Sequence, residues 1–197
     1  QPQGVLVDPT ILDFLSREEV HAGLGEVIKY GAIRDSKFFN DISEWLDDIE
    51  SFPFEKAIYR SCEIKAEIVS LDEREGGLRR LLNFGHTIGH ALEANLGYGK
   101  IRHGEAIALG MKCSGWISEQ LNFMSKSENQ FLVQTIDKLT LPSTSKMDYD
   151  SILSFVKKDK KVRNGVLHFV VLDALGKGNI CDKVSYDLIK ESLKILL

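Results

Sequence analysis

The segment 83–90 (NFGHTIGH) constrains the fold of this 197-residue chain more than any other part of its sequence. His86 and His90 are four residues apart, so they share one face of a helix. Gly85 and Gly89 beside them would let a second backbone, or a ligand, approach closely. We therefore predict a tightly packed helix that begins near Gly85, although an H-x-x-x-H pair alone can also arise by chance.

Most of the remaining chain shows helical periodicity. A glycine-containing segment at 72–80 is predicted to be a loop, and Asp35, Ser36 and Ser185 are candidate helix N-caps. Helices are predicted at about 18–33, 36–49, 53–71, 85–96, 103–116, 127–139, 148–158 and 185–197.

Strand-like runs are few, so the predicted fold class is mainly α with a small β element. One strand is predicted at 166–172, with 179–181 as its hairpin partner. Another is predicted at 4–8, where a partner is needed to satisfy the backbone groups. This strand could be the last one of a sheet whose other strands are missing.

Composition excludes several functional classes. The net charge of −4 argues against a general nucleic-acid binder, and no run approaches the roughly 20 apolar residues of a membrane span. No signal peptide opens the chain, which begins with Gln1 and so suggests a processed or truncated end. Cys62, Cys113 and Cys181 are widely spaced and odd in number, which favours reduced, buried thiols and a cytoplasmic location.

A third histidine, His103, begins the next predicted helix in the sequence His-Gly-Glu and could fold back on the first two. Imidazoles with a carboxylate suit Zn²⁺, but spacing leaves open which of them bind. The carboxylate candidate is Glu26, three residues before Lys29. The alternative for that pair is a surface ion pair worth under about 1 kcal/mol.

Several cations surround these residues in sequence. One or two of them beside a metal would suit a phosphorylated or carboxylated substrate, and the others are expected to be solvated. His21 is expected on a helix surface and His168 in a strand, neither with a role. The cations are Lys65, Arg79, Arg80 and the run Lys157, Lys158, Lys160, Lys161 and Arg163.

Together these pieces resemble 3-dehydroquinate synthase, in the stretches 23–33, 64–93, 103–111 and 159–161. LNFGHTIGHALE after DEREGGLR is the specific signature, whereas Gly25 stands where the family more often has alanine. The resemblance implies an N-terminal α/β domain that binds NAD⁺ and a multihelical C-terminal domain that holds Zn²⁺ or Co²⁺. Residues 17–197 would be that second domain, and 1–16 a remnant strand and linker of the absent first domain.

The resemblance also implies site residues. Its metal ligands fall on Glu26, His86 and His103. Positions for catalysis and proton transfer fall on Lys29, Glu75 and His90. Substrate-binding positions fall on Lys29, Lys65, Arg79, Asn83, His90 and, in the DKK motif, Lys160 in preference to Lys161. The segment that touches NAD⁺ consists of Ile11, Leu12, Asp13 and Phe14.

The implied activity is a lyase reaction of the shikimate pathway of aromatic amino-acid biosynthesis, carried out by a homodimer. It converts 3-deoxy-D-arabino-heptulosonate 7-phosphate to 3-dehydroquinate and phosphate. The alternatives are a related sugar-phosphate cyclase, a metal-dependent polyol dehydrogenase, or a non-catalytic helical domain for assembly. A structural zinc would have four protein ligands, and a catalytic zinc three and a water.

Overall fold

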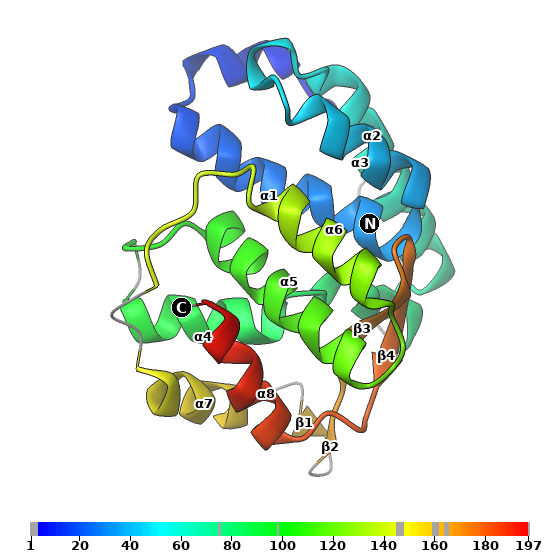
Figure 1. Cartoon of the computed structure of the whole chain (residues 1–197). Coiled ribbons are helices and arrows are strands. Elements are labelled where there is room, and N and C mark those ends of the chain that lie inside the picture. The colour runs from blue at the N-terminus through cyan, green and yellow to red at the C-terminus, as the bar shows by residue number, and fades with distance from the viewer. Residues whose placement is uncertain are drawn as a thin grey trace.

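Helices form most of the chain, as predicted, and they are arranged around α1 and α5 (Figure 1). The structure is a computed structural model that describes residues 4–74, 76–97, 99–144, 148–158, 162–163 and 166–196. The α-helices are α1 (Arg17–Arg34), α2 (Ser36–Trp45), α3 (Phe54–Leu71), α4 (His86–Leu96), α5 (His103–Gln120), α6 (Lys126–Ile136), α7 (Tyr149–Lys158) and α8 (Tyr186–Leu193). Short 3-10 helices are η1 (Pro9–Phe14), η2 (Ile49–Ser51), η3 (Leu78–Asn83) and η4 (Lys194–Leu196).

The β element consists of two antiparallel pairs. Strand β1 (Val162–Arg163) pairs with β2 (Val166–Leu167), and β3 (Phe169–Ala174) pairs with β4 (Lys177–Cys181). The strand predicted at 166–172 is thus interrupted at His168, between β2 and β3. Gly176 adopts φ of 81° in the β3–β4 turn, and its N–H donates to the Ala32 carbonyl oxygen at 2.8 Å, which fastens the hairpin to α1.

The hydrophobic core has two parts that meet at α5. One part lies among α1, α2 and α3 and includes Ile28, Phe39 and Ile64. The other lies among α4, α7, α8 and β3 and includes Ile88 and Phe169. Helix α5 is buried around nearly its whole circumference, as expected for a helix at the centre of a domain.

Glycines allow α1 and α4 to approach α5 more closely than side chains would permit. A Cβ on Gly104 of α5 would lie 1.8 Å from the Ala22 carbonyl oxygen of α1. A Cβ on Gly110 of α5 would lie 2.1 Å from the carbonyl oxygen of Gly85, at the start of α4. A Cβ on Gly25 of α1 would lie 2.6 Å from the Gly104 carbonyl oxygen. The three backbones therefore pack in direct contact.

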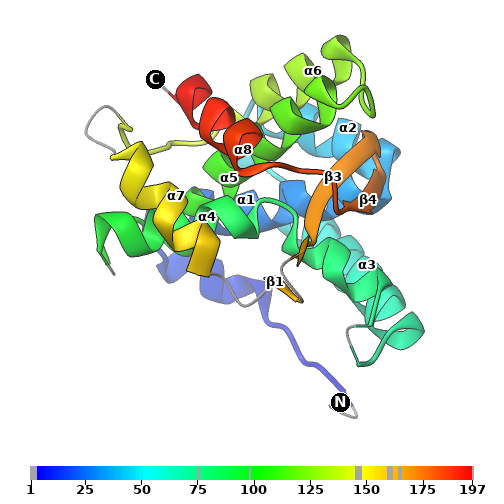
Figure 2. The ribbon, with the colours of Figure 1, turned by 90° about the horizontal axis from the view of Figure 1, so that it is seen from below.

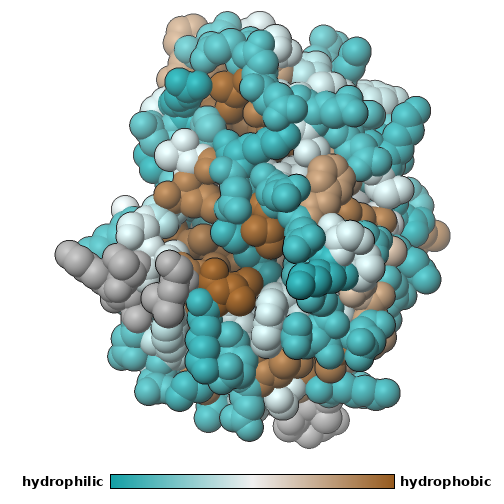
Figure 3. All heavy atoms as spheres, viewed as in Figure 1, coloured by the Kyte–Doolittle hydropathy of each residue, from teal (hydrophilic) through white to brown (hydrophobic). Residues whose placement is uncertain are grey.

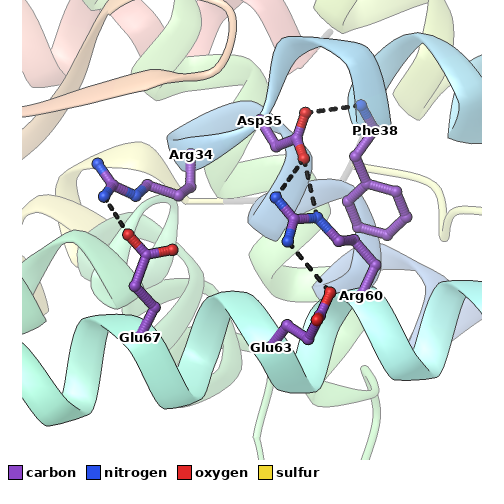
Figure 4. Close-up of polar contacts among 6 residues, drawn as sticks. All are labelled: Arg34, Asp35, Phe38, Arg60, Glu63 and Glu67. Carbon is purple, nitrogen blue, oxygen red and sulfur yellow. Dashed lines mark hydrogen bonds and ion pairs between the residues drawn. The ribbon is translucent and has the colours of Figure 1, made fainter.

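The α1–α2 junction is fixed by an ion pair to α3 (Figure 4). Asp35 caps α2 as predicted, because its side chain accepts from Phe38 N–H at 3.0 Å. Its Oδ2 atom also accepts from Nε and Nη2 of Arg60, at 2.9 and 2.6 Å. Arg34 pairs with Glu67 beside it, so two cross-links hold α3 against this corner.

The strand predicted at 4–8 does not form in this chain. Residues 4–8 have no regular secondary structure, and Leu6 is 98% exposed. The chain here runs away from the helices (Figure 2). No strand among the described residues lies beside this segment to pair with it, which accounts for the difference.

Three smaller predictions are corrected as well. His21 is buried, at 6% exposure, because the chain after α6 crosses α1 and Thr140 N–H donates to its Nδ1 at 3.0 Å. Cys62 is exposed on α3, whereas Cys113 and Cys181 are buried as predicted. The predicted loop at 72–80 passes into η3 at Leu78.

Hydrophobic residues are visible at several places on the face that carries α6 and α8. Figure 3 shows them there as small groups separated by hydrophilic residues. Among the described residues, no helix is both long enough and apolar enough to cross a membrane.

The glycine contacts predict that Gly104→Ala destabilises the fold. We expect a loss of roughly 1–3 kcal/mol in the free energy of unfolding, because the added methyl group must push α1 and α5 apart. Gly23→Ala is the matched control, since a Cβ there meets no atom within 4 Å, and it should stabilise α1 by up to about 1 kcal/mol. Urea denaturation measures both, and equal effects would contradict the close packing.

The Asp35–Arg60 pair predicts a pH-dependent effect of Asp35→Asn, which keeps a capping oxygen and removes the charge. Burial alone would raise the pKa of Asp35, but hydrogen bonds from Phe38 and Arg60 outweigh it and hold the pKa below 3.8. The contribution of the charge is therefore present above pH 3.8 and lost as the pH falls through the folded-state pKa.

For this partly exposed pair we expect a loss of up to about 1 kcal/mol at pH 7. Urea unfolding at a series of pH values should show the two proteins converging in acid. A difference that stays constant into acid would show that the charge of Asp35 is not its source.

Candidate metal centre

Three helices bring one carboxylate and two imidazoles to a common point. Glu26 comes from α1, His86 from the first position of α4, and His103 from the first position of α5. The Nε2 atoms of His86 and His103 lie 3.6 and 3.7 Å from the same oxygen, Oε1 of Glu26. The glycine contacts between these helices fix this convergence.

The Oε1 atom of Glu26 is buried and has no hydrogen-bond partner in the part of the chain that the structure describes. Both nitrogens lie too far from it for good hydrogen bonds, which need about 2.7–3.2 Å. Two ligand atoms on one tetrahedral zinc, each about 2.0–2.1 Å from the ion, stand about 3.3 Å apart. The donor set and its spacing therefore fit a divalent metal ion better than a direct ion pair.

Lys29 holds the other oxygen of the same carboxylate. Its Nζ atom lies 2.5 Å from Oε2 of Glu26, and the residue is only 3% exposed. Burial lowers the pKa of Lys29, and repulsion from Lys65 adds to this, while Glu26 opposes it. The sequence left open a surface ion pair between Glu26 and Lys29, and the burial of Lys29 rules this out. The other oxygen of Glu26, Oε1, faces the histidines.

The Nδ1 atoms of both histidines are anchored on the opposite sides of their rings. His86 Nδ1 lies 3.1 Å from the Phe84 carbonyl oxygen, which can only accept. His103 Nδ1 lies 3.3 Å from each carboxylate oxygen of Glu93 on α4. Protonated Nδ1 atoms leave the lone pairs on Nε2, directed at Glu26.

His90 also lies at this point, which reopens the question of which histidines bind. It is exposed on α4, and its ring centre is 5.3 Å from that of His86 and 5.7 Å from that of His103. The three imidazoles offer nitrogen atoms that all lie within 4.8 Å of one another. Glu105, in contrast, accepts from the backbone N–H of Arg102 at 2.8 Å, so it caps α5.

The other predicted site residues are more dispersed. Lys65 is exposed on α3, but its positive charge lies close enough to Lys29 to help lower the pKa of that residue. Arg79 is tied to the 72–79 loop, because its Nη1 atom donates to the Glu73 carbonyl oxygen at 2.8 Å. Asn83 ends η3, two residues before Gly85.

The remaining predictions concern η1 and residues that the structure leaves out. The segment predicted to touch NAD⁺ forms η1, with Phe14 at 88% exposure and Ile11, Leu12 and Asp13 exposed or half-exposed. Glu75, Lys160 and Lys161 lie outside the described residues.

Glu93 was missed in the sequence. Its signal was present, because His86, His90 and Glu93 follow the spacing i, i+4, i+7 and so lie along one stripe of α4.

Proteins of known name are similar to this chain over nearly its whole length. 3-Dehydroquinate synthases of Rippkaea orientalis and Thermosynechococcus vestitus are both 42% identical to this chain, over 96% and 98% of it and 54% of each relative. The chain thus spans about half the length of the curated relatives it matches.

Solved structures with the same fold include two cyclases. One is 2-epi-5-epi-valiolone synthase from Streptomyces hygroscopicus subsp. jinggangensis with NAD⁺ and Zn²⁺ bound, at 22% identity and a TM-score of 0.86, covering 97% of this chain and 54% of that one. The other is 2-deoxy-scyllo-inosose synthase complexed with carbaglucose-6-phosphate, NAD⁺ and Co²⁺, at 24% identity and a TM-score of 0.71, covering 92% and 52%. These likenesses show that the chain shares its fold with about half of each of these proteins.

The family assignment rests on the chain's own sequence. Residues 23–162, which include α4, α5 and the part of α1 that carries Glu26, match the model of the family described as 3-dehydroquinate synthase C-terminal. The chain therefore belongs to the 3-dehydroquinate synthase C-terminal family.

Proposed function

We propose that this chain is the metal- and substrate-binding part of a 3-dehydroquinate synthase. The observation that carries the proposal is the buried, unpartnered Oε1 of Glu26, which faces Nε2 of His86 and of His103. The reaction would be the conversion of 3-deoxy-D-arabino-heptulosonate 7-phosphate to 3-dehydroquinate and phosphate, a carbon–oxygen lyase step. The 42% identity to named synthases supports this substrate over those of the two structural neighbours.

Glu26, His86 and His103 would hold a Zn²⁺ or Co²⁺ ion, leaving a coordination position for substrate. When bound, such an ion acts as a Lewis acid that lowers the pKa of a substrate hydroxyl and polarises a ketone. A set of three protein ligands would leave a position open, unlike a closed structural zinc site with four.

The chain's own cations would then bind and orient the substrate. Lys29 keeps Glu26 in place and presents a buried positive charge where an oxyanion develops. Lys65, Arg79 and Asn83, together with Lys160, would meet the phosphate and carboxylate groups, as the family resemblance implies. Positive charge at this place suits a phosphorylated sugar acid better than the neutral substrate of a polyol dehydrogenase.

Proton transfer is assigned to His90 and Glu75. His90 is exposed beside the two other imidazoles, so it can exchange protons with substrate or solvent near neutral pH. The role of Glu75 comes from the family resemblance alone.

NAD⁺, when bound, would supply the hydride-transfer chemistry of the proposed reaction. We propose that residues 17–197 form the metal and substrate domain, and that 1–16 lead from an N-terminal domain that binds the dinucleotide. The exposed apolar side chains of Val5, Leu6, Ile11 and Phe14 support this, because such residues are ordinarily covered by a partner. A homodimer is also proposed from the resemblance, and a cytoplasmic location from it and the three free cysteines.

The ligand set predicts different outcomes for two neighbouring histidines. The chain should bind about one zinc ion. His86→Ala should weaken zinc binding more than about 100-fold, whereas His90→Ala should change it less than about 10-fold. Competition with a chromophoric chelator measures both. If the two variants lose zinc equally, the three histidines, and not Glu26 with two of them, form the site.

The domain division predicts that this chain alone releases no phosphate from the substrate. Addition of a separately produced N-terminal half with NAD⁺ should restore turnover, and the His86→Ala chain should stay inactive in the same mixture. Phosphate release measures the outcome. A wild-type mixture that binds zinc and NAD⁺ but remains inactive would count against the proposed reaction.

A further inference from the structure

His103 is the most exposed of the three proposed ligands, so its ring needs an anchor. Its side chain is 48% exposed, compared with 12% for His86. The ring of His86 is held by a backbone carbonyl, which no mutation of a side chain removes. The Nδ1 atom of His103 is held by a side chain, the carboxylate of Glu93 at 3.3 Å.

We propose that Glu93 is a positioning residue for the metal centre, because it fixes the tautomer and the orientation of His103. This inference rests on the proposed metal site. Both carboxylate oxygens lie 3.3 Å from Nδ1, so a proton on Nδ1 has two acceptors. The lone pair then remains on Nε2, 3.7 Å from Oε1 of Glu26.

The negative charge of Glu93 has a second effect. A carboxylate that accepts from Nδ1 raises the basicity of the other ring nitrogen and so strengthens its bond to a metal. Glu93 is not placed to bind the ion in place of a histidine, since its oxygens lie on the Nδ1 side of the His103 ring. Its action on the metal therefore passes through His103.

Helix geometry explains why a residue ten positions before His103 can do this. Glu93 follows His90 by three residues and His86 by seven, so all three occur on the face of α4 that meets the start of α5. Gly110, packed against Gly85, sets the distance between the two helices and so brings the carboxylate within reach of the ring.

A purely structural ion pair is the competing explanation, and metal binding distinguishes the two. We would measure zinc affinity by chelator competition, and the visible absorption spectrum after substitution with Co²⁺, for Glu93→Gln and Glu93→Ala. Glu63→Gln is the matched control, because it removes a carboxylate that pairs with Arg60 on the surface of α3. Thermal unfolding of the metal-free proteins monitors folding.

We expect Glu93→Ala to weaken zinc binding about 10–100-fold and to alter the Co²⁺ spectrum. Glu93→Gln should lie between it and the wild type, because its amide oxygen still accepts from Nδ1 without the charge. The control should bind zinc as the wild type does, and metal-free unfolding temperatures should be alike.

Two results would overturn the inference. Wild-type zinc affinity and Co²⁺ spectra in both Glu93 variants would reject the positioning role while the metal site stands. A wild-type chain that binds no zinc would reject the proposed metal site and this inference with it. The isosteric Glu93→Gln variant decides the matter if Glu93→Ala does not fold.

Discussion

Direct backbone contact between α5 and its two neighbours is the constraint on which the rest of the structure depends. Gly104 meets the α1 backbone at Ala22, and Gly110 meets Gly85 at the start of α4. Glu26, His86 and His103 each lie within four residues of one of these contacts. Larger residues at Gly104 or Gly110 would push the helices apart by a distance comparable to the spacing between the three proposed ligands. Core packing and site geometry are therefore set by the same few glycines.

Hydrogen bonds fix the side chains of the resulting site, except at one carboxylate oxygen. Lys29 binds one oxygen of Glu26, Phe84 and Glu93 hold the Nδ1 atoms of the histidines, and the other oxygen of Glu26 is left unpartnered among the described residues. A buried carboxylate oxygen without a partner is costly, on the order of 1–3 kcal/mol or more. Together with two nitrogen lone pairs on the same point, this cost favours a bound cation. The arrangement is thus preorganised, with little movement needed when a metal binds.

The helices could be predicted from the sequence, because their apolar periodicity and their caps at Asp35 and Ser185 are local signals. Burial that depends on distant segments could not. The sequence predicts His21 on a helix surface, but Thr140, 119 residues away in the sequence, covers it. The spacing i, i+4, i+7 places Glu93 on the same face of α4 as His86 and His90. Its contact with His103 depends on how α5 packs against α4, which is a tertiary contact that the sequence pattern does not give. The strand predicted at 4–8 does not form here because a strand also requires a neighbour.

All three proposed metal ligands and their anchors come from α1, α4 and α5, and from the short segment between η3 and α4. Exposed apolar residues before α1 and in η1, by contrast, have nothing to cover them in this structure. The chain spans about half of its relatives, and these residues are where a second half would pack.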